Sequence, residues 1–443
     1  MIKQILKRDG RIVPFNREKI TFAVLQAAVS VGGRDRVKAE KVTDDVVQML
    51  EQRQHRDSIP TVEEVQDLVE KALIERGHAK TAKAYIVYRY EHALKRSGRK
   101  SLTYSADNIP YEKLWEALSW AVDHHCVHLE QIAQSIREGR YDRLVRDCEE
   151  FYAQELARAG EKLDERLDAV KMVIIAGPSS SGKTTTTIKV EQQLKVKGYR
   201  FVPINVDHFF LDLEDHPKDL RGDYDFETPQ ALDIAQINKT FKALLQGEQV
   251  EVPFYNFKTG KREGSSGRLQ LGEGDILLVD SLHGLHPEMT EGIPEERKFP
   301  LYIETLSQVK DRNSQFVRWA DIRLLRRMVR DMLFRNYSPT QTIRHWHYVR
   351  RSELRYIVPR LPEAEVIVNS FLPYEIAIMK QRVGRLFPQF LQEFKEDADS
   401  ADAYDRALRI HRMFEQVPAW TDEQIVPGDS LLREFIGGSV YEY

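Results

Sequence analysis

Gly177-Pro178-Ser179-Ser180-Ser181-Gly182-Lys183-Thr184 is the segment from which the rest of this chain can be interpreted. It follows the apolar run 173–176 and precedes residues 185–197, whose composition suits a helix, so a strand, a loop and a helix are predicted in that order. The glycines allow backbone N–H groups to turn toward a polyphosphate, and the N-terminus of the helix adds positive potential. In such a loop Lys183 reaches the β- and γ-phosphates and Thr184 ligates Mg²⁺. A Gly/Ser-rich linker is the alternative, but a linker would not lie between a buried strand and a helix.

This loop predicts that the chain binds ATP together with Mg²⁺. The residues expected to hold the nucleotide are Gly177, Ser179, Ser180, Ser181, Gly182, Lys183, Thr184 and Thr185. The use that is made of the nucleotide has to be inferred from residues elsewhere in the chain.

The composition is that of a globular protein with two or three domains. The chain has 443 residues, of which 42% are hydrophobic and 30% charged, an ordinary balance for a packed core. Acidic and basic residues are interspersed and the net charge is −3, which argues against the basic surface of a nucleic-acid-binding protein. Two cysteines are too few for a disulfide framework, and no apolar run has the length of a membrane helix. We therefore expect a cytoplasmic protein with neither nucleic acid nor membrane as a partner.

Carboxylates follow two of the later strands that the sequence predicts. Four further apolar segments, with helix-compatible sequence between them, are candidates for strands: 201–206, 275–279, 298–304 and 363–369. This alternation predicts an α/β fold with a doubly wound parallel sheet, in which ligands bind beyond the carboxyl ends of the strands. Asp207 and Asp280 follow the first two segments and are expected near Lys183. Asp207 would accept the proton of a substrate hydroxyl and Asp280 would support Mg²⁺ beside Thr184, unless either aspartate only caps the segment that follows its strand.

Four arginines are concentrated in one predicted helix. They are Arg323, Arg326, Arg327 and Arg330. Their spacing of three and four residues would align them on one face, as a lid that closes over phosphates requires. The alternative is a solvated face that pairs with Asp321 and Asp331. Together with Lys183 and Asp207, these arginines form the predicted catalytic set.

Several separated motifs between residues 170 and 370 resemble the uridine kinase and phosphoribulokinase family of P-loop kinases. Residues 205–210 (Asn-Val-Asp-His-Phe-Phe) are similar to the strand end that carries the family's catalytic aspartate. Residues 224–231 resemble its hydroxyl-binding segment, residues 252–262 the segment that closes over the nucleoside base, and residues 323–331 its lid. The resemblance implies substrate contacts by Asp225, Glu227, Tyr255, Arg262 and Gln341.

The sequence departs from the family pattern at the base and metal positions. Gly260 replaces the histidine that reads a pyrimidine, Asp280-Ser281 stands where Glu-Gly is usual, and Glu227 stands where an aspartate is usual. The resemblance implies an Mg-ATP-dependent kinase for a small-molecule hydroxyl, with a nucleoside 5′-hydroxyl as the favoured acceptor. A kinase for a non-nucleoside sugar, polyol or vitamin precursor remains an alternative, as does a nucleotide-responsive regulator without turnover.

The first 95 residues predict a small α+β domain. Arg8-Asp9-Gly10-Arg11 lies between two short apolar segments and predicts a hairpin, and helices are expected over 16–30, 37–53, 61–77 and 79–93. This stretch resembles the ATP-cone, the nucleotide-binding regulatory module of ribonucleotide reductases. The resemblance implies an ATP or dATP effector bound by Lys7, Arg8 and Lys19, and control of assembly in a homo-oligomer. A solvated basic hairpin on a helical interaction domain is the alternative.

The remaining segments are predicted to be helical. The expected organisation is an ATP-cone at 1–95, a helical connector at 96–167, the P-loop kinase domain at 168–372 and a helical extension at 373–443. In the connector, His124, His125 and Cys126 point in different directions on a helix, so surface or core positions are expected and a metal site is not. Residues 426–439 resemble the C-terminal signature of a bacterial subgroup of uridine kinase-like proteins, and only a packing role is predicted for them.

Overall fold

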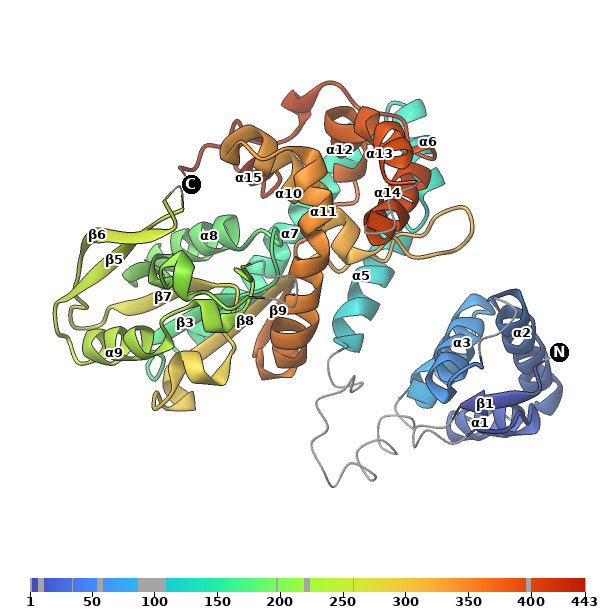
Figure 1. Ribbon diagram of the computed structural model, residues 1–443. Helices are drawn as coiled ribbons and strands as arrows, with labels where there is room; N and C mark the ends of the chain where they lie inside the picture. Colours follow the sequence, from blue (N-terminus) through green and yellow to red (C-terminus); the bar gives the residue numbers. More distant parts are fainter. Residues whose placement is uncertain are drawn as a thin grey trace. The chain divides into compact units, whose positions relative to one another are not determined.

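The computed structural model in Figure 1 divides into two compact units, residues 1–107 and 108–443. The residues that it describes are 2–6, 12–33, 35–53, 59–86, 109–196, 198–218, 224–257, 259–395 and 400–442. Each unit has its own core and is described separately. Lys7 and Arg8, two of the three residues predicted to bind an effector, lie outside the described residues.

The N-terminal unit combines a short hairpin with helices. Strands β1 (Gln4–Leu6) and β2 (Ile12–Pro14) pair antiparallel, and they are followed by α1 (Glu18–Ser30), α2 (Arg36–Arg53), α3 (Val62–Glu75) and a helical segment at 79–86. Thr61 and Glu64 form the predicted capping box of α3, with Thr61 N donating to Glu64 Oε2 at 2.7 Å and Glu64 N donating to Thr61 Oγ1 at 3.2 Å. Apolar side chains of all three helices, including Val24, Val46 and Leu68, form the core.

The second unit is built on a parallel sheet of five strands. The strands are β3 (Met172–Ala176), β4 (Phe201–Asn205), β7 (Ile276–Ser281), β8 (Lys298–Glu304) and β9 (Val366–Asn369). Their order is β4-β7-β3-β8-β9 and every neighbouring pair is parallel. Val173 and Ile175 of β3 belong to one core and Ile174 to another. Because successive side chains of a strand point to opposite faces, both faces of the sheet are covered, as the predicted doubly wound fold requires.

Helices and a second hairpin surround this sheet (Figure 1). They are α8 (Lys183–Lys195), α9 (Ile234–Leu245), the antiparallel strands β5 (Val250–Asn256) and β6 (Lys261–Leu269), α10 (Trp319–Arg330) and α11 (Pro339–Ser352). Short 3-10 or π-helical turns occupy Val206–Phe209, Leu213–Asp215, Pro229–Ala231, Pro287–Thr290, Glu295–Arg297, Asp331–Arg335, Glu353–Ile357, Val358–Glu363, Gly384–Leu386 and Glu423–Ile425.

The segments on either side of the predicted kinase domain pack into the same core as the sheet. They comprise α5 (Tyr111–Asp123), α6 (Leu129–Arg137), α7 (Tyr141–Asp164), α12 (Glu375–Val383), α13 (Phe387–Glu393), α14 (Ala401–Phe414) and α15 (Arg433–Ile436). Tyr141 Oη donates to the carbonyl of Tyr374 at 2.6 Å, and the N–H of Asn369 donates to Glu155 at 2.9 Å. The domain boundaries at 96, 168 and 373 stay predictions, but one apolar core extends across those at 168 and 373, from residue 121 to residue 436.

The two thiols of the predicted connector and the ring of His124 are part of its packing. Cys126 and Cys148 are both buried and free, and His124 stacks on Trp120 with ring centroids 4.3 Å apart. Among the described residues no group of three or more His, Cys, Asp or Glu side chains could hold a metal ion. None of the described helices combines the length and the apolar character needed to cross a membrane.

Candidate active site

The loop 177–182 runs from the end of β3 to the start of α8 and depends on its glycines. Gly182 has φ +94°, and a Cβ atom there would lie 2.3 Å from Cδ1 of Leu431. A Cβ atom at Gly177 would lie 2.3 Å from the carbonyl oxygen of Ile303. The hydroxyls of Ser180 and Ser181 are buried and have no hydrogen-bond partner among the described residues. Because buried polar groups are normally hydrogen-bonded, these hydroxyls fit a polar ligand in the loop.

Lys183, Thr184 and Asp280 meet at the carboxyl end of the sheet. Thr184 Oγ1 lies 3.5 Å from Asp280 Oδ2. Burial lowers the pKa of Lys183, and the negative charges of Asp280 and Asp207 oppose that effect. Burial also raises the pKa of Asp280 to about 7, although Lys183 opposes this rise. The structure therefore brings the predicted lysine and both predicted aspartates into one electrostatic environment.

The hydroxyl of Thr184 and the carboxylate of Asp280 are suitable ligands for Mg²⁺. Mg²⁺ prefers oxygen and is usually held by one or two protein groups together with phosphate oxygens and waters. The pair supplies a hydroxyl and a carboxylate oxygen side by side.

Asp207 lies in the 3-10 turn directly after β4. Its N–H donates to the side chain of Asn205 at 2.9 Å, so Asn205 caps the turn. The register of the sheet places Asn205 opposite Asp280, so the two strand ends lie side by side. The charge of Asp207 acts on the pKa values of Lys183, Asp280 and Glu227. Asp207 therefore faces the space in front of the loop.

The structure divides the four arginines of α10 into two pairs, and the first pair is fully buried. Arg323 Nε lies 2.8 Å from Glu304 and its Nη2 lies 3.0 Å from Glu353. Arg326 Nε lies 2.6 Å from Glu375. Both guanidiniums also donate to the phosphate loop, Arg323 to the carbonyl of Ser179 at 3.1 Å and Arg326 to the carbonyl of Ser181 at 3.3 Å. The catalytic role of all four arginines stays a prediction, but these two already bind carboxylates and brace the loop.

The second pair is only partly buried and faces the loop. Arg327 Nη1 donates to Ser179 Oγ at 2.8 Å and lies 3.5 Å from Glu227. Burial alone would lower the pKa of Arg327, but Glu227 and Asp331 outweigh it. Arg330 differs, because burial and the repulsion of Arg335 and Arg327 lower its pKa to about 9. Its Nε has no hydrogen-bond partner among the described residues, so Arg330 carries charge that a bound anion could neutralise.

Of the residues predicted to contact substrate, Glu227 lies beside Arg327 and Asp225 lies next to Glu227, while Tyr255 belongs to an aromatic cluster with Phe210. Burial raises the pKa of Glu227, with Arg327 opposing the shift. Asp225 accepts a hydrogen bond from the N–H of Glu227 at 3.2 Å and lies 3.3 Å from Arg351. Tyr255 packs against the rings of Phe210, His216 and Phe257, and its buried hydroxyl has no partner in the described part of the chain.

Arg262 and Gln341, the other two residues predicted to contact substrate, have local structural partners. Arg262 Nη1 lies 3.0 Å from Asp233, and its Nε donates to the carbonyl of Phe210 at 2.7 Å. Gln341 forms a capping box with Ser338 at the start of α11, with its Oε1 3.0 Å from Ser338 N. These contacts account for both side chains without a substrate, and their binding role stays a prediction. Lys19, the described member of the predicted effector set, is exposed on α1.

The backbone at Gly260 leaves little room for the histidine of the family pattern. It adopts φ +68°, and a Cβ atom there would lie 2.9 Å from Cβ of Leu213. Its carbonyl accepts a hydrogen bond from Leu213 N at 2.8 Å. The hairpin therefore approaches the 213–215 turn so closely that a side chain at position 260 would require a rearrangement.

Sequence reasoning missed the carboxylates that complete the site. Glu304, Glu353 and Glu375 neutralise the buried arginines, and nothing near them in the sequence signals this pairing. Glu434, in the C-terminal motif, accepts hydrogen bonds from Thr185 N at 3.1 Å and Thr185 Oγ1 at 2.8 Å. The sequence predicts only a packing role for this motif, and no local signal indicates that it reaches the loop.

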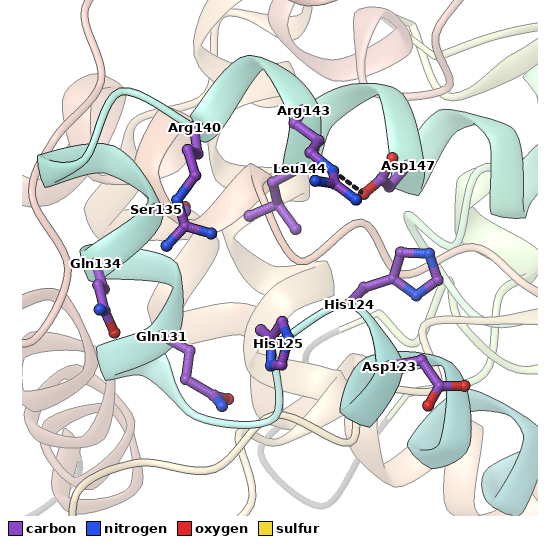
Figure 2. Close-up of a pocket in the computed structure, with 10 residues that line it drawn as sticks. All are labelled: Asp123, His124, His125, Gln131, Gln134, Ser135, Arg140, Arg143, Leu144 and Asp147. Atoms are coloured by element: carbon purple, nitrogen blue, oxygen red, sulfur yellow. Dashed lines mark ion pairs between the residues drawn. The ribbon is translucent and has the colours of Figure 1, made fainter.

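A separate hollow of about 500 Å³ lies among α5, α6 and α7 (Figure 2). Its lining is polar and of mixed charge, and the figure shows the ion pair between Arg143 and Asp147 at its wall, with a distance of 3.7 Å. The lining residues are Asp123, His124, His125, Gln131, Gln134, Ser135, Arg140, Arg143, Leu144 and Asp147. None of them belongs to the phosphate loop or to a strand end.

Each of the two units contains a segment that matches a known protein family. Residues 172–377 match the phosphoribulokinase / uridine kinase family, and residues 3–94 match the ATP cone domain. This chain joins an ATP-cone domain to a domain of the phosphoribulokinase and uridine kinase family. Every residue of the predicted catalytic set lies within the kinase-family domain. Glu434 lies beyond it.

Three relatives illustrate these matches. Uridine-cytidine kinase B of Dictyostelium discoideum is 26% identical over 206 residues, which cover 46% of this chain and 76% of that protein. The uridine kinase of Deinococcus deserti is 28% identical over 195 residues, or 44% of this chain and 84% of that protein. The vitamin B12-dependent ribonucleoside-diphosphate reductase of Thermoplasma acidophilum is 40% identical over 94 residues, or 20% of this chain and 12% of that protein.

Proposed function

We propose that this chain is a kinase that transfers the γ-phosphoryl group of ATP to a hydroxyl of a small metabolite, with a nucleoside 5′-hydroxyl as the favoured acceptor. The observation that carries the proposal is the convergence of Lys183, Asp207 and Asp280 in front of a phosphate loop with unpartnered hydroxyls. The family of residues 172–377 and the two uridine kinase relatives support it.

In this reaction the acceptor oxygen attacks the γ-phosphorus, the bond to the β-phosphate oxygen breaks, and ADP leaves. Asp207 takes the proton of the attacking hydroxyl. Lys183, Arg327 and Arg330 place positive charge around the phosphoryl group that moves. Thr184 and Asp280 would hold Mg²⁺, which supplies charge neutralisation for the phosphates when it is bound. Arg323 and Arg326 act indirectly, by holding the carbonyls of Ser179 and Ser181 in place.

The acceptor would lie between the carboxylates and the aromatic cluster. Asp225 and Glu227 provide acceptors for substrate hydroxyls, and the ring of Tyr255 provides an apolar surface. Gly260 supports a second candidate, a kinase for a non-nucleoside sugar, polyol or vitamin precursor, because no side chain at this position can read a base. The two candidates differ only in the acceptor.

We further propose that the ATP-cone binds ATP or dATP, with Lys7, Arg8 and Lys19 near the phosphates, and that it controls the activity of a cytoplasmic homo-oligomer. The match of residues 3–94 and the ribonucleotide reductase relative support this regulation. Size-exclusion mass measurements with each nucleotide test it. Identical mass and identical turnover with ATP and dATP would contradict regulation by the cone.

The decisive experiment measures ADP release with Mg-ATP against a panel of nucleosides, deoxynucleosides and small polyols, each with and without dATP. The full chain is compared with Asp207→Asn, and Asp142→Asn on the exposed face of α7 serves as the matched control. Turnover on one acceptor that is lost only in Asp207→Asn establishes both the reaction and the base. If none of the three proteins releases ADP with any acceptor of the panel, the result favours a regulator without turnover. If Asp207→Asn turns over as fast as the unaltered protein, the proposed role of Asp207 as base is refuted.

A further inference from the structure

The C-terminal residues 430–438, here called the 430–438 segment, lie on the phosphate loop. Glu434 Oε2 accepts hydrogen bonds from the N–H of Thr185 at 3.1 Å and from its hydroxyl at 2.8 Å. Leu431 contacts Gly182 so closely that a Cβ atom on the glycine would lie 2.3 Å from its side chain. Glu434 itself is only 8% exposed. One carboxylate and one apolar side chain of this segment therefore cover the start of α8.

Glu434 accepts hydrogen bonds from groups at the start of α8 that, in a phosphate loop, donate to a bound nucleotide. Thr185 is the third residue of α8, so its N–H belongs to the first turn of the helix. In phosphate loops such groups cradle the α- and β-phosphates. A carboxylate oxygen and a phosphate oxygen have the same charge sign and accept the same hydrogen bonds, so they compete for Thr185.

We propose that the 430–438 segment is an autoinhibitory strap in which Glu434 takes the place of an ATP phosphate on Thr185, so that Glu434 must withdraw from α8 before ATP is bound tightly. This inference rests on the proposed binding of ATP at the loop. It lies outside the matched kinase-family domain, which ends at residue 377.

The charge of Glu434 reaches the other groups of the active site. Its negative charge acts on Lys183, Arg330 and Asp280, and it is one of the groups that hold the pKa of Asp280 above its ordinary value. A triphosphate would bring negative charge to the same lysine and arginine. Two sets of negative charge in one buried space repel each other, which opposes simultaneous binding.

The strap is anchored on both sides of Glu434. Before it, Ser430 Oγ lies 2.6 Å from Glu149 and 3.1 Å from the hydroxyl of Tyr374. After it, the ring of Phe435 lies 5.3 Å from the guanidinium carbon of Arg326. Gly437 and Gly438 follow with φ +83° and +74°. The short α15 therefore lies between a polar anchor and two glycines that allow the chain to change direction.

Titration calorimetry of the full chain with Mg-ADP tests the proposal. Glu434→Gln keeps the size of the side chain and removes its charge, and a hydrogen bond to a charged group is worth roughly a tenfold change in affinity, so Mg-ADP should bind about ten times more tightly. Glu442→Gln makes the same change at an exposed residue near the end of the chain and should bind like the unaltered protein. Equal or weaker binding by Glu434→Gln overturns the strap while leaving the proposed function intact. No binding by any of the three proteins overturns both.

Hydrogen exchange gives an independent readout. With saturating Mg-AMP-PNP, amides of residues 430–438 should exchange faster than in the free protein, because the strap is displaced. Slower exchange would mean that the segment is a fixed wall of the nucleotide site, and unchanged exchange would mean that it does not respond to nucleotide. Either result overturns the proposal.

Discussion

The two pairs of arginines on α10 have the same chemistry and nearly the same place in the sequence, yet their surroundings differ. Arg323 and Arg326 have carboxylates at hydrogen-bonding distance and are fully buried. Arg330, one helical turn further on, has an Nε without a hydrogen-bond partner among the described residues and a pKa lowered to about 9, mainly by burial. Charge that is paired supports the loop, whereas charge that is left over is available to a ligand.

The carboxylates repeat this contrast. Burial would raise the pKa of Glu353, but Arg323 and Arg350 outweigh it and the pKa falls. Asp280 has no arginine among the groups that shift it, and burial raises its pKa to about 7. The buried carboxylate Glu353 is therefore neutralised by arginines, whereas Asp280 is not.

Arg326→Met should have the largest effect on stability. It leaves Glu375 buried without its partner, and loss of one member of a buried ion pair costs about 3 to 5 kcal/mol. The midpoint of thermal unfolding should fall by about 5 to 10 °C. The double variant Arg326→Met/Glu375→Leu removes both charges and should recover most of this loss. A single variant as stable as the unaltered protein would show that the pair does not brace the loop.

Arg330→Met should lower activity and leave stability nearly unchanged, which is the reverse of the effect expected for Arg326→Met. Loss of a group that stabilises charge in a transition state typically lowers kcat by about 10²- to 10³-fold. Its thermal midpoint should stay within about 2 °C, because its ion pair with Asp331, at 3.8 Å, is too long for a hydrogen bond and Asp331 also pairs with Arg327. Arg335→Met, at a residue whose side chain is 52% exposed, is the matched control and should retain activity. If the Arg330→Met protein is unfolded or fully active, the assignment of a functional role to Arg330 and a structural role to Arg326 is wrong.

The pH dependence of stability should have opposite signs for Asp280 and Glu353. The expected effect is smaller than those of the arginine variants. The pKa of Asp280 is raised from 3.8 to about 7, so between these values the folded chain retains a proton that the unfolded chain releases. Its contribution to stability is therefore lost as the pH rises, by about 1 kcal/mol per pH unit. Glu353, whose pKa is lowered, has the opposite dependence, and its contribution is lost as the pH falls below its ordinary value of 4.5.

Thermal midpoints measured from pH 4 to pH 8 check these signs. Asp280→Asn should remove the decline toward neutral pH, whereas Glu353→Gln should leave that decline in place. Parallel curves for the unaltered protein and Asp280→Asn would show that the raised pKa of Asp280 does not govern stability in this range.

Sequence reasoning predicted the features that depend on local pattern. The strand, loop and helix around Lys183, the capping box at Thr61 and the strand ends at Asp207 and Asp280 all follow from short-range signals. On α10 the local pair Arg327 and Asp331, four residues apart, was also foreseeable. Asp321, the other expected partner, pairs with Arg409 instead, at 3.0 Å.

The features that were missed depend on long-range contacts. The partners of Arg323 and Arg326 come from β8, the 353–357 turn and α12, and no periodicity in the sequence connects these segments. The same holds for Glu434, which is 249 residues from Thr185. Burial determines whether an arginine is structural or functional, and burial is a property of the assembled fold.

The core that extends from α7 through the sheet to α15 also has a consequence for folding kinetics. The hydrogen bond between Tyr141 and Tyr374 joins residues 233 positions apart, and parallel strands of the sheet lie between them in the sequence. Such contacts form only after long loops have closed, so folding of this unit should be slow and its early intermediates should expose apolar surface. A chain that emerges from the ribosome cannot complete the environment of its phosphate loop until its last helices have been synthesised.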